Sequence, residues 1–194
     1  DLPKTRHFGV DSDQKVKVRI FLRHSHCHLD FPDFETELSS VVSRAVEAGV
    51  HRMVTICTKL HQEPTVRAIS EQYAPVFYAA GVHPMSVAAE PMTSVDELVA
   101  LSQHPKFVGI GETGLDYHYT AESAEVQKQS LMIHIQAAQE TGLPLIIHAR
   151  DADEDMANLL REGYENKPYS CVKGLANQPF EQIKQRRNSV ALLV

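Results

Sequence analysis

The sequence lacks the features that mark several common protein classes. No apolar run approaches the roughly 20 residues that span a bilayer. Residues 1–14 lack the apolar core of about 7–15 residues that a secretion signal carries, so a cytoplasmic protein that does not enter a membrane is expected. Three scattered cysteines without CxxC spacing predict neither a disulfide framework nor a zinc knuckle; they are Cys27, Cys57 and Cys171.

An early glycine-rich phosphate loop is also missing. No GxGxxG or GxxxxGK motif follows any of the first apolar runs, whereas a doubly wound nucleotide-binding sheet favours such a loop after an early strand. What the chain does have is 194 residues, 43% of them hydrophobic, and a formal charge of −6. These values are typical of one soluble domain with a buried core.

Apolar runs rich in strand-forming residues alternate with amphipathic stretches. The expected strands are 16–22, 52–58, 76–81, 107–111 and 143–147, and the expected helices are 33–48, 63–73, 94–103, 122–141 and 151–162. The strand ends recur at intervals close to the roughly 31 residues of a β/α barrel unit. The sequence therefore predicts a TIM-type (β/α)8 barrel, incomplete here, with about five βα units. Residues 1–15 are expected to be an unassigned extension, 16–165 a partial barrel domain, and 166–194 an atypical tail in place of strands six to eight.

Potential metal ligands follow the expected strands, at the end of the barrel where catalytic groups gather. His26 and His28 are two residues apart, so in extended backbone both imidazoles face one side and can bind one ion. Neutral imidazole suits zinc, manganese or iron. Taken alone, this pair is equally consistent with exposed loop histidines.

Glu112 and His148 strengthen the metal hypothesis. Glycines on both sides of Glu112 allow close backbone approach, and a carboxylate there can bridge two metals. His148 follows a continuous apolar run. A salt-bridged loop acid and a core histidine are the alternatives for these two residues. Arg150 can clamp a phosphate or form a salt bridge at a helix start, and His83 can contact substrate or face solvent.

Four motifs in order carry a resemblance to a known family. They are His26-Cys27-His28-Leu29-Asp30, Gly81-Val82-His83-Pro84, Gly111-Glu112-Thr113-Gly114-Leu115-Asp116-Tyr117 and Ile147-His148-Ala149-Arg150-Asp151. Together they resemble the TatD family of metal-dependent deoxyribonucleases, in the amidohydrolase superfamily. The resemblance implies a TIM-type barrel with one or two divalent ions (zinc, magnesium or manganese) that hydrolyses phosphodiester bonds in DNA. It maps the metal ligands to His26, His28, Glu112 and His148, with Glu112 as the catalytic residue and His83 lining the site.

The sequence departs from the family pattern in its last part. It has His24 where the family usually has Asp, no histidine after His148, and no late Glu-Thr-Asp motif. A truncated or frame-shifted chain with weak or no activity is therefore expected. The open edge of the fifth strand predicts self-association.

Two other functions remain open. One is hydrolysis of a small-molecule amide, lactone or phosphoester on the same barrel, because a net charge of −6 argues against broad electrostatic binding of DNA. If DNA is the substrate, the metal and a few cations such as Arg150 would hold it locally. The other is a non-catalytic fragment that binds a partner through its open edge.

Overall fold

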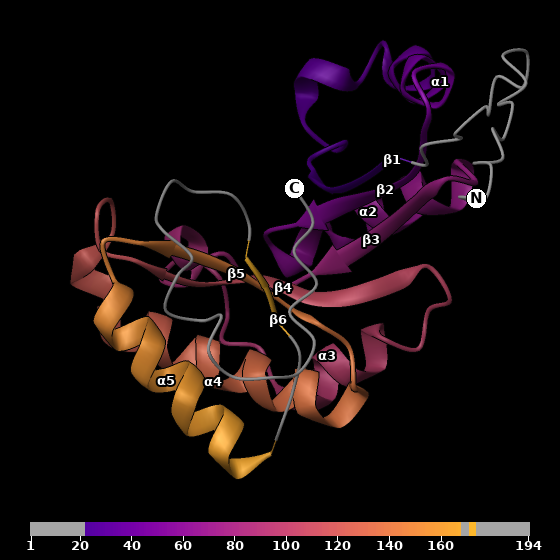
Figure 1. Cartoon of the computed structure of the whole chain (residues 1–194). Coiled ribbons are helices and arrows are strands. Elements are labelled where there is room, and N and C mark those ends of the chain that lie inside the picture. The colour runs from indigo at the N-terminus through magenta and orange to yellow at the C-terminus, as the bar shows by residue number, and fades with distance from the viewer. Residues whose placement is uncertain (1–21, 168–170, 174–194) are drawn as a thin grey trace, which may run out of the picture.

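The computed structural model describes residues 22–167 and 171–173 of the chain, which form one six-stranded parallel sheet (Figure 1). The strands lie in chain order and are β1 (Leu22–Cys27), β2 (Val50–Cys57), β3 (Val76–Ala80), β4 (Phe107–Asp116), β5 (Leu145–Arg150) and β6 (Cys171–Lys173). Parallel neighbours that are consecutive in sequence require crossover connections, and each connection between the described strands contains an α-helix. This curled parallel sheet is an incomplete β/α barrel, as predicted.

Five α-helices and four short 3-10 turns connect the described strands. The helices are α1 (Leu38–Glu47), α2 (Glu63–Gln72), α3 (Val95–Leu101), α4 (Ala124–Thr141) and α5 (Asp153–Asn166). The turns are η1 (Pro32–Phe34), η2 (Leu60–Gln62), η3 (Pro84–Ser86) and η4 (Ala121–Ser123). In Figure 1, α3, α4 and α5 line one side of the sheet, whereas α1 packs against β2 near the other end of the sheet. Within the described ranges, none of the helices combines the length and apolar character that crossing a membrane would need.

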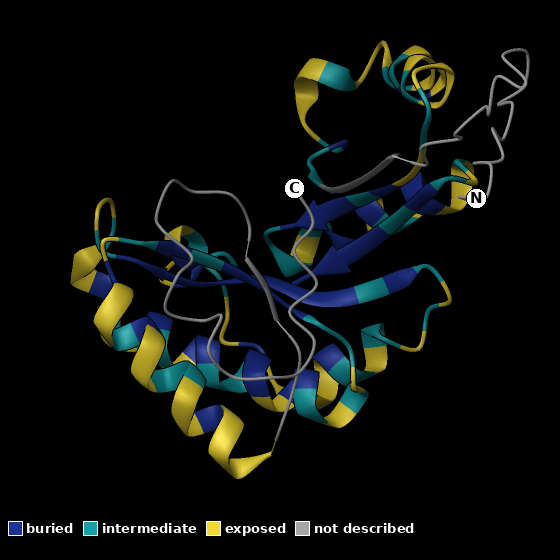
Figure 2. Cartoon of the chain, in the orientation of Figure 1, coloured by how far each residue is buried: buried dark blue, intermediate teal, exposed yellow. Residues whose placement is uncertain are grey.

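Helix α4 supplies much of the main core. Leu131, Ile135 and Ala138 recur at helical spacing on its buried side and join Ile110 and Leu145 from the neighbouring strands. In Figure 2, buried residues, in dark blue, run along the strands of the sheet and recur along α4.

Two predicted helix boundaries are confirmed. The helix predicted to end at 141 does end there, because Gly142 adopts a left-handed conformation with φ of 69° and its N–H donates to Ala138. The cap of α3 lies at Ser94, whose side chain accepts a hydrogen bond from the Glu97 amide. Local sequence signals therefore define the end of α4 and the start of α3.

Strands β1, β4 and β5 differ most from the predicted ranges, while β2 and β3 differ by no more than two residues at an end. The first strand was expected at 16–22, but β1 occupies Leu22–Cys27, and residues 1–21 lie outside the described part. Strands β4 and β5 run past their predicted ends at 111 and 147, because their pairing continues from Thr113 opposite Ile147 to Asp116 opposite Arg150. The polar residues that interrupt the apolar pattern therefore belong to the strands, and their side chains project from regular strand backbone.

The sequence had suggested that the edge of the fifth strand is open. In the structure this edge is not open along its whole length. Strand β6 pairs in parallel with Leu145–Ile147 of β5, in the segment expected to replace strands six to eight. Residues 168–170 and 174–194 lie outside the described residues. Self-association through an open β5 edge therefore loses part of its structural basis.

The prediction of a helix over 33–48 is wrong for its first turns. Pro32 begins the short turn η1, and the regular helix α1 starts only at Leu38. Within α1 only Val42 is buried.

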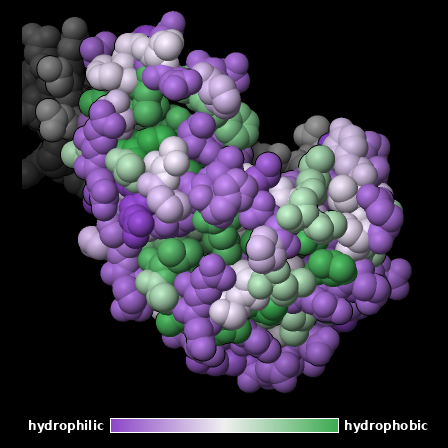
Figure 3. Space-filling model, turned by 180° about the vertical axis from the view of Figure 1, so that it is seen from behind, coloured by the Kyte–Doolittle hydropathy of each residue, from purple (hydrophilic) through white to green (hydrophobic). Residues whose placement is uncertain are grey.

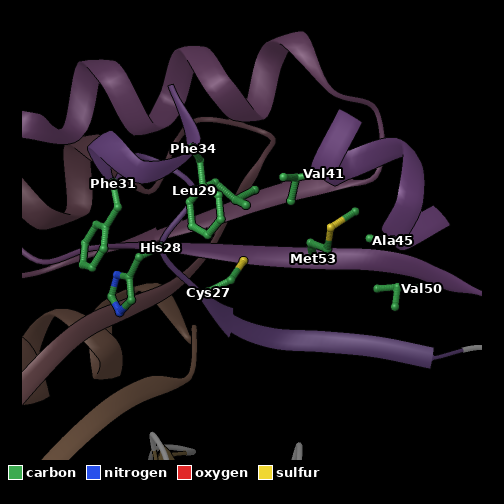
Figure 4. Close-up of a pocket in the computed structure, with 9 residues that line it drawn as sticks. All are labelled: Cys27, His28, Leu29, Phe31, Phe34, Val41, Ala45, Val50 and Met53. Atoms are coloured by element: carbon green, nitrogen blue, oxygen red, sulfur yellow. The ribbon is translucent and has the colours of Figure 1, made fainter. Parts of the chain in front are cut away.

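An apolar pocket of about 400 Å³ lies between α1 and the sheet, lined by Cys27, His28, Leu29, Phe31, Phe34, Val41, Ala45, Val50 and Met53 (Figure 4). Hydrophobic atoms are also visible on the outside of this part of the molecule (Figure 3).

Candidate metal centre

The five histidine and glutamate residues singled out in the sequence converge, although they come from strands far apart in the chain. His26 lies in β1, Glu112 in β4 and His148 in β5. His28 directly follows β1, and His83 follows β3. The potential ligand atoms of His26, His28 and Glu112 lie within 4.8 Å of one another, and so do those of His83, Glu112 and His148. Glu112 belongs to both groups.

The Glu112 carboxylate is buried between two imidazoles. Its Oε2 lies 3.3 Å from Nε2 of His26, and its Oε1 lies 3.6 Å from Nδ1 of His148. Burial alone would raise the pKa of Glu112, but hydrogen bonds from His148 and His26 outweigh it and hold this pKa well below its usual range. Glu112 is therefore an ionised carboxylate with each oxygen directed at a different histidine.

The ring of His28 is held in one orientation by two contacts. Its Nδ1 lies 3.2 Å from the carbonyl oxygen of Ile56, which can only accept a hydrogen bond. The ring of Phe31 also stacks on it, with the centroids 4.7 Å apart. Since Nδ1 must carry the proton, the neutral ring leaves its Nε2 lone pair free for an ion.

His148 is oriented by a carboxylate that sequence reasoning did not assign. The buried Asp116 places Oδ2 2.9 Å from Nε2 of His148. Burial would lower the pKa of His148, but hydrogen bonds to Glu112 and Asp116 raise it above its ordinary value. Without an ion, Nδ1 of His148 therefore donates to Glu112. If an ion took the place of that proton, the shorter contact with Asp116 would keep the remaining proton on Nε2, and Nδ1 would offer its lone pair to the ion. A carboxylate behind a ligating histidine is a common feature of metal sites.

His83 lines the same centre but presents a different hydrogen-bonding face. Its ring lies 4.3 Å from that of His148, and its Nδ1 accepts a hydrogen bond from the amide of Met85. The neutral ring therefore carries its proton on Nε2 and is set up to donate. Burial lowers the pKa of His83 to about 4, although Glu112 opposes this shift. The geometry thus favours the substrate-contact hypothesis for His83 over a ligand role.

Arg150 lies at the end of β5, where its guanidinium sits 4.5 Å from the centroid of the Tyr119 ring. The neighbouring Asp151 forms an ion pair with His118 at 2.9 Å. Tyr119 in turn donates its backbone N–H to Asp116. Arg150 is therefore connected to the histidine-carboxylate cluster through the segment that follows β4.

Close backbone approach at the glycines around Glu112 is confirmed. A Cβ at Gly111 would meet the carbonyl oxygen of Ile146, and one at Gly114 would meet the carbonyl oxygen of His148. Together with Gly109, these glycines have the spacing GxGxxG, but all three lie inside β4 and not in a turn between a strand and a helix. They bring β4 and β5 together and do not form a phosphate-binding loop.

Sequence reasoning assigned no role to two further acids near the centre. Asp116 lies four residues after Glu112 in β4, and this even spacing could have placed both on one face. Asp30 closes the motif that contains His28, and its Oδ1 is buried without a hydrogen-bond partner among the described residues. Burial raises the pKa of Asp30.

The donor set fits a divalent ion. Nitrogen atoms from several imidazoles and two oxygens of one buried carboxylate are the ligands that zinc and manganese accept in proteins. The tautomers of His28 and His148 leave one lone pair each. The unpartnered buried oxygen of Asp30, close in sequence to His28, is a further polar atom among the described residues that a cation would stabilise.

Comparison with known proteins agrees with this geometry. The family model for TatD related DNase matches residues 24–186. An uncharacterized metal-dependent hydrolase of Bacillus subtilis, YabD, is 36% identical over 141 residues, which are 71% of this chain and 54% of the relative. A 3'-5' ssDNA/RNA exonuclease TatD of Citrobacter koseri is 30% identical over 159 residues, covering 80% of this chain and 61% of that protein.

A solved structure is similar as well. The crystal structure of YjjV, a TatD homologue from Escherichia coli, superposes with a TM-score of 0.73 at 29% identity, covering 82% of this chain and 62% of that one. The chain spans about half the length of the first curated relatives it matches. The family model covers well over half of this chain. The chain therefore belongs to the family of TatD-related DNases.

Proposed function

We propose that this chain is a metal-dependent hydrolase of the TatD DNase type, which cleaves phosphodiester bonds in DNA with water as the nucleophile. The observation that carries the proposal is the position of Glu112, whose two carboxylate oxygens face different histidines, His26 and His148. With His28, these residues would hold one or two divalent ions. Zinc, magnesium and manganese are the candidates.

When bound, a divalent ion in such a site lowers the pKa of a water molecule that it holds and polarises a phosphate oxygen. The side chains of the protein supply the rest. Glu112 is ionised and buried, so it supplies negative charge where the cations bind. Asp116 keeps the proton of His148 on Nε2 and so fixes which nitrogen faces Glu112. His28 is held in a ligating orientation by Ile56.

The substrate would be held by groups beside the metal ligands. His83 is neutral near pH 7 and can donate through Nε2 to a phosphate oxygen. Arg150 can offer a planar guanidinium to the same phosphate from its position over Tyr119. Because the formal charge of the chain is −6, binding through this local set is more consistent with the composition than a broad basic surface.

A nuclease assay tests the proposal. Single-stranded DNA and bis(p-nitrophenyl) phosphate are incubated with the protein and Mg²⁺, Mn²⁺ or Zn²⁺, beside Glu112→Gln and the control Glu90→Gln. Glu90 also contacts a histidine, His61, but outside the candidate centre. We expect metal-dependent cleavage of DNA that is lost in Glu112→Gln and retained in Glu90→Gln.

Two outcomes would contradict the proposal. One is cleavage that survives Glu112→Gln, which would assign the activity to another site or to a contaminant. The other is hydrolysis of the small phosphodiester without any cleavage of DNA, which would favour the small-molecule hydrolase. The weak or absent activity expected from the sequence stays a prediction, so the assay compares the rate with that of a relative of full length.

A further inference from the structure

His134 is a buried histidine on α4 that takes no part in the candidate metal centre. Its side chain is 0% exposed, yet both ring nitrogens have partners. Nδ1 lies 2.7 Å from the carbonyl oxygen of Ser130, and Nε2 lies 3.1 Å from the backbone nitrogen of Val82. Since a carbonyl only accepts and an amide N–H only donates, the ring is neutral and carries its proton on Nδ1. Burial also lowers the pKa of His134 to about 4, in agreement with this tautomer.

Through this contact His134 accepts a hydrogen bond from the Val82 N–H, a donor that the pairing of the strands does not use. The regular pairing of β3 with β4 ends at Ala80 opposite Ile110. Beyond that point the amides alternate in direction: Gly81 donates to Cys57 and His83 donates to Thr58, both at the end of β2. The amide between them, on the buried Val82, points the other way and meets His134. Without His134 as the acceptor, the buried N–H of Val82 would lose this hydrogen bond, which is costly for a buried backbone group.

The same contact fixes the backbone next to His83. Because Val82 directly precedes His83, the position of its amide helps to set where the His83 ring leaves the backbone. That ring packs 4.3 Å from His148 at the candidate centre. Helix α4 belongs to the main core through Leu131 and Ile135, so His134 connects the loop after β3 to a helix that is anchored in this core.

We propose that His134 is a positioning residue: by accepting the Val82 amide it fixes the backbone that carries His83, and so holds the His83 ring against His148. The effect on catalysis rests on the proposed hydrolase function, whereas the effect on the position of the ring does not. A positioning role of this kind can be large, because a displacement of about 1 Å costs roughly 100-fold in rate.

Two substitutions separate the acceptor from the volume of the side chain. His134→Gln keeps an oxygen that can reach the Val82 amide, whereas His134→Leu has a similar size and no acceptor. Ile135→Val is the matched control, because it also alters a fully buried residue of α4 but leaves the hydrogen bond intact. Thermal unfolding identifies any variant that fails to fold.

Kinetics in two backgrounds provide the first measurement. In the wild-type background we expect His134→Leu to lower kcat/KM for DNA by about tenfold or more, while His134→Gln and Ile135→Val stay within about threefold. In the His83→Ala background, His134→Leu should cause no further loss, because it acts through His83. An equal loss in both backgrounds, or no loss in the wild-type background, would overturn the proposal.

Nuclear magnetic resonance provides a second measurement that needs no activity. We expect the Val82 amide to be protected from exchange in the wild type and in His134→Gln, and to exchange at least about tenfold faster in His134→Leu, with loss of the nuclear Overhauser effect between His83 and His148. Retention of that effect in folded His134→Leu would overturn the proposal. If the wild type does not cleave DNA, the proposed function fails, while this measurement still decides the role of His134.

Discussion

Asp116 holds Nε2 of His148 at 2.9 Å across the pairing of two adjacent strands. The contact determines which nitrogen of the imidazole is available on the other side of the ring. Asp116 is itself fixed, since its Oδ1 accepts the backbone N–H of Tyr119 and its own N–H donates to Gln127. A carboxylate held in this way keeps the histidine ready for an ion at little cost in conformational entropy.

Removal of the Asp116 charge is expected to weaken metal binding. In Asp116→Asn the neutral amide no longer selects the His148 tautomer, so the affinity for Zn²⁺ should fall about 10–100-fold. Isothermal titration calorimetry measures this, with Asp96→Asn, an exposed position at the start of α3, as the control. Unchanged affinity in Asp116→Asn would show that His148 does not bind the ion through Nδ1.

Gly114→Ala is expected to separate β4 from β5. The new Cβ would overlap the carbonyl oxygen of His148, and φ at this residue is 146°, where residues other than glycine are strained. We predict a loss in the free energy of unfolding of at least about 2–3 kcal/mol, measured by urea denaturation.

Gly142→Ala serves as the comparison for this variant. Gly142 also has a positive φ, of 69°, but a Cβ added there would meet no other atom within 4 Å. Only the backbone strain of about 1 kcal/mol is therefore expected. Equal losses in the two variants would mean that the close approach at Gly114 does not contribute.

The stability of the protein should fall in mild acid because of His134. Burial lowers the pKa of His134 to about 4, whereas a histidine in the unfolded chain titrates near about 6.5. Between these values the unfolded chain binds a proton that the folded chain does not, so stability is complete above about pH 6.5 and falls as the pH drops toward about 4. The expected loss is about 3 kcal/mol.

Urea denaturation at pH 7 and pH 4.5 measures this loss in the wild type and in His134→Gln. The variant should lose much of the pH dependence; a remainder is expected from His83, whose pKa is lowered in the same direction. The same pH dependence in both proteins would contradict the assignment to His134.

Arg150→Lys tests the contact with substrate. A lysine keeps the charge but loses the planar fork and the stacking on Tyr119. We expect KM for DNA to rise by about five- to tenfold with little change in kcat, since the contact is made in the ground state as well. Arg161→Lys, on the exposed side of α5, should leave both constants unchanged. A loss confined to kcat would indicate a role in the transition state instead.

The sequence predicted the convergence of the site better than the boundaries of the strands that carry it. Strand β1 contains His24, Ser25 and His26, so its composition has no apolar alternation, and only its pairing with β2 defines it as a strand. The late parts of β4 and β5 were missed for the same reason. The pattern of apolar residues in a sequence indicates which positions face a buried core. Residues that line a polar centre do not follow this pattern.

The supporting residues could not be found from the sequence in the same way. Asp116 stands within a recognisable motif, but its contact with His148 depends on the register between two strands. His134 stands alone in an amphipathic helix, and a contact with a backbone amide 52 residues away leaves no local signal. The candidate ligands could be predicted because several of them share motifs, whereas the contacts that orient them depend on the fold.

In the proposed site, Glu112 is the carboxylate that His26 and His28 on one side and His148 on the other would share around bound ions. Calorimetric titration of the metal-free protein with Zn²⁺ tests it most directly, in the wild type, in Glu112→Gln and in the control Glu90→Gln. We expect Glu112→Gln to weaken binding by about 100-fold or more, equivalent to about 2.7 kcal/mol, and Glu90→Gln to bind as the wild type does. Equal affinity in the wild type and Glu112→Gln would contradict it.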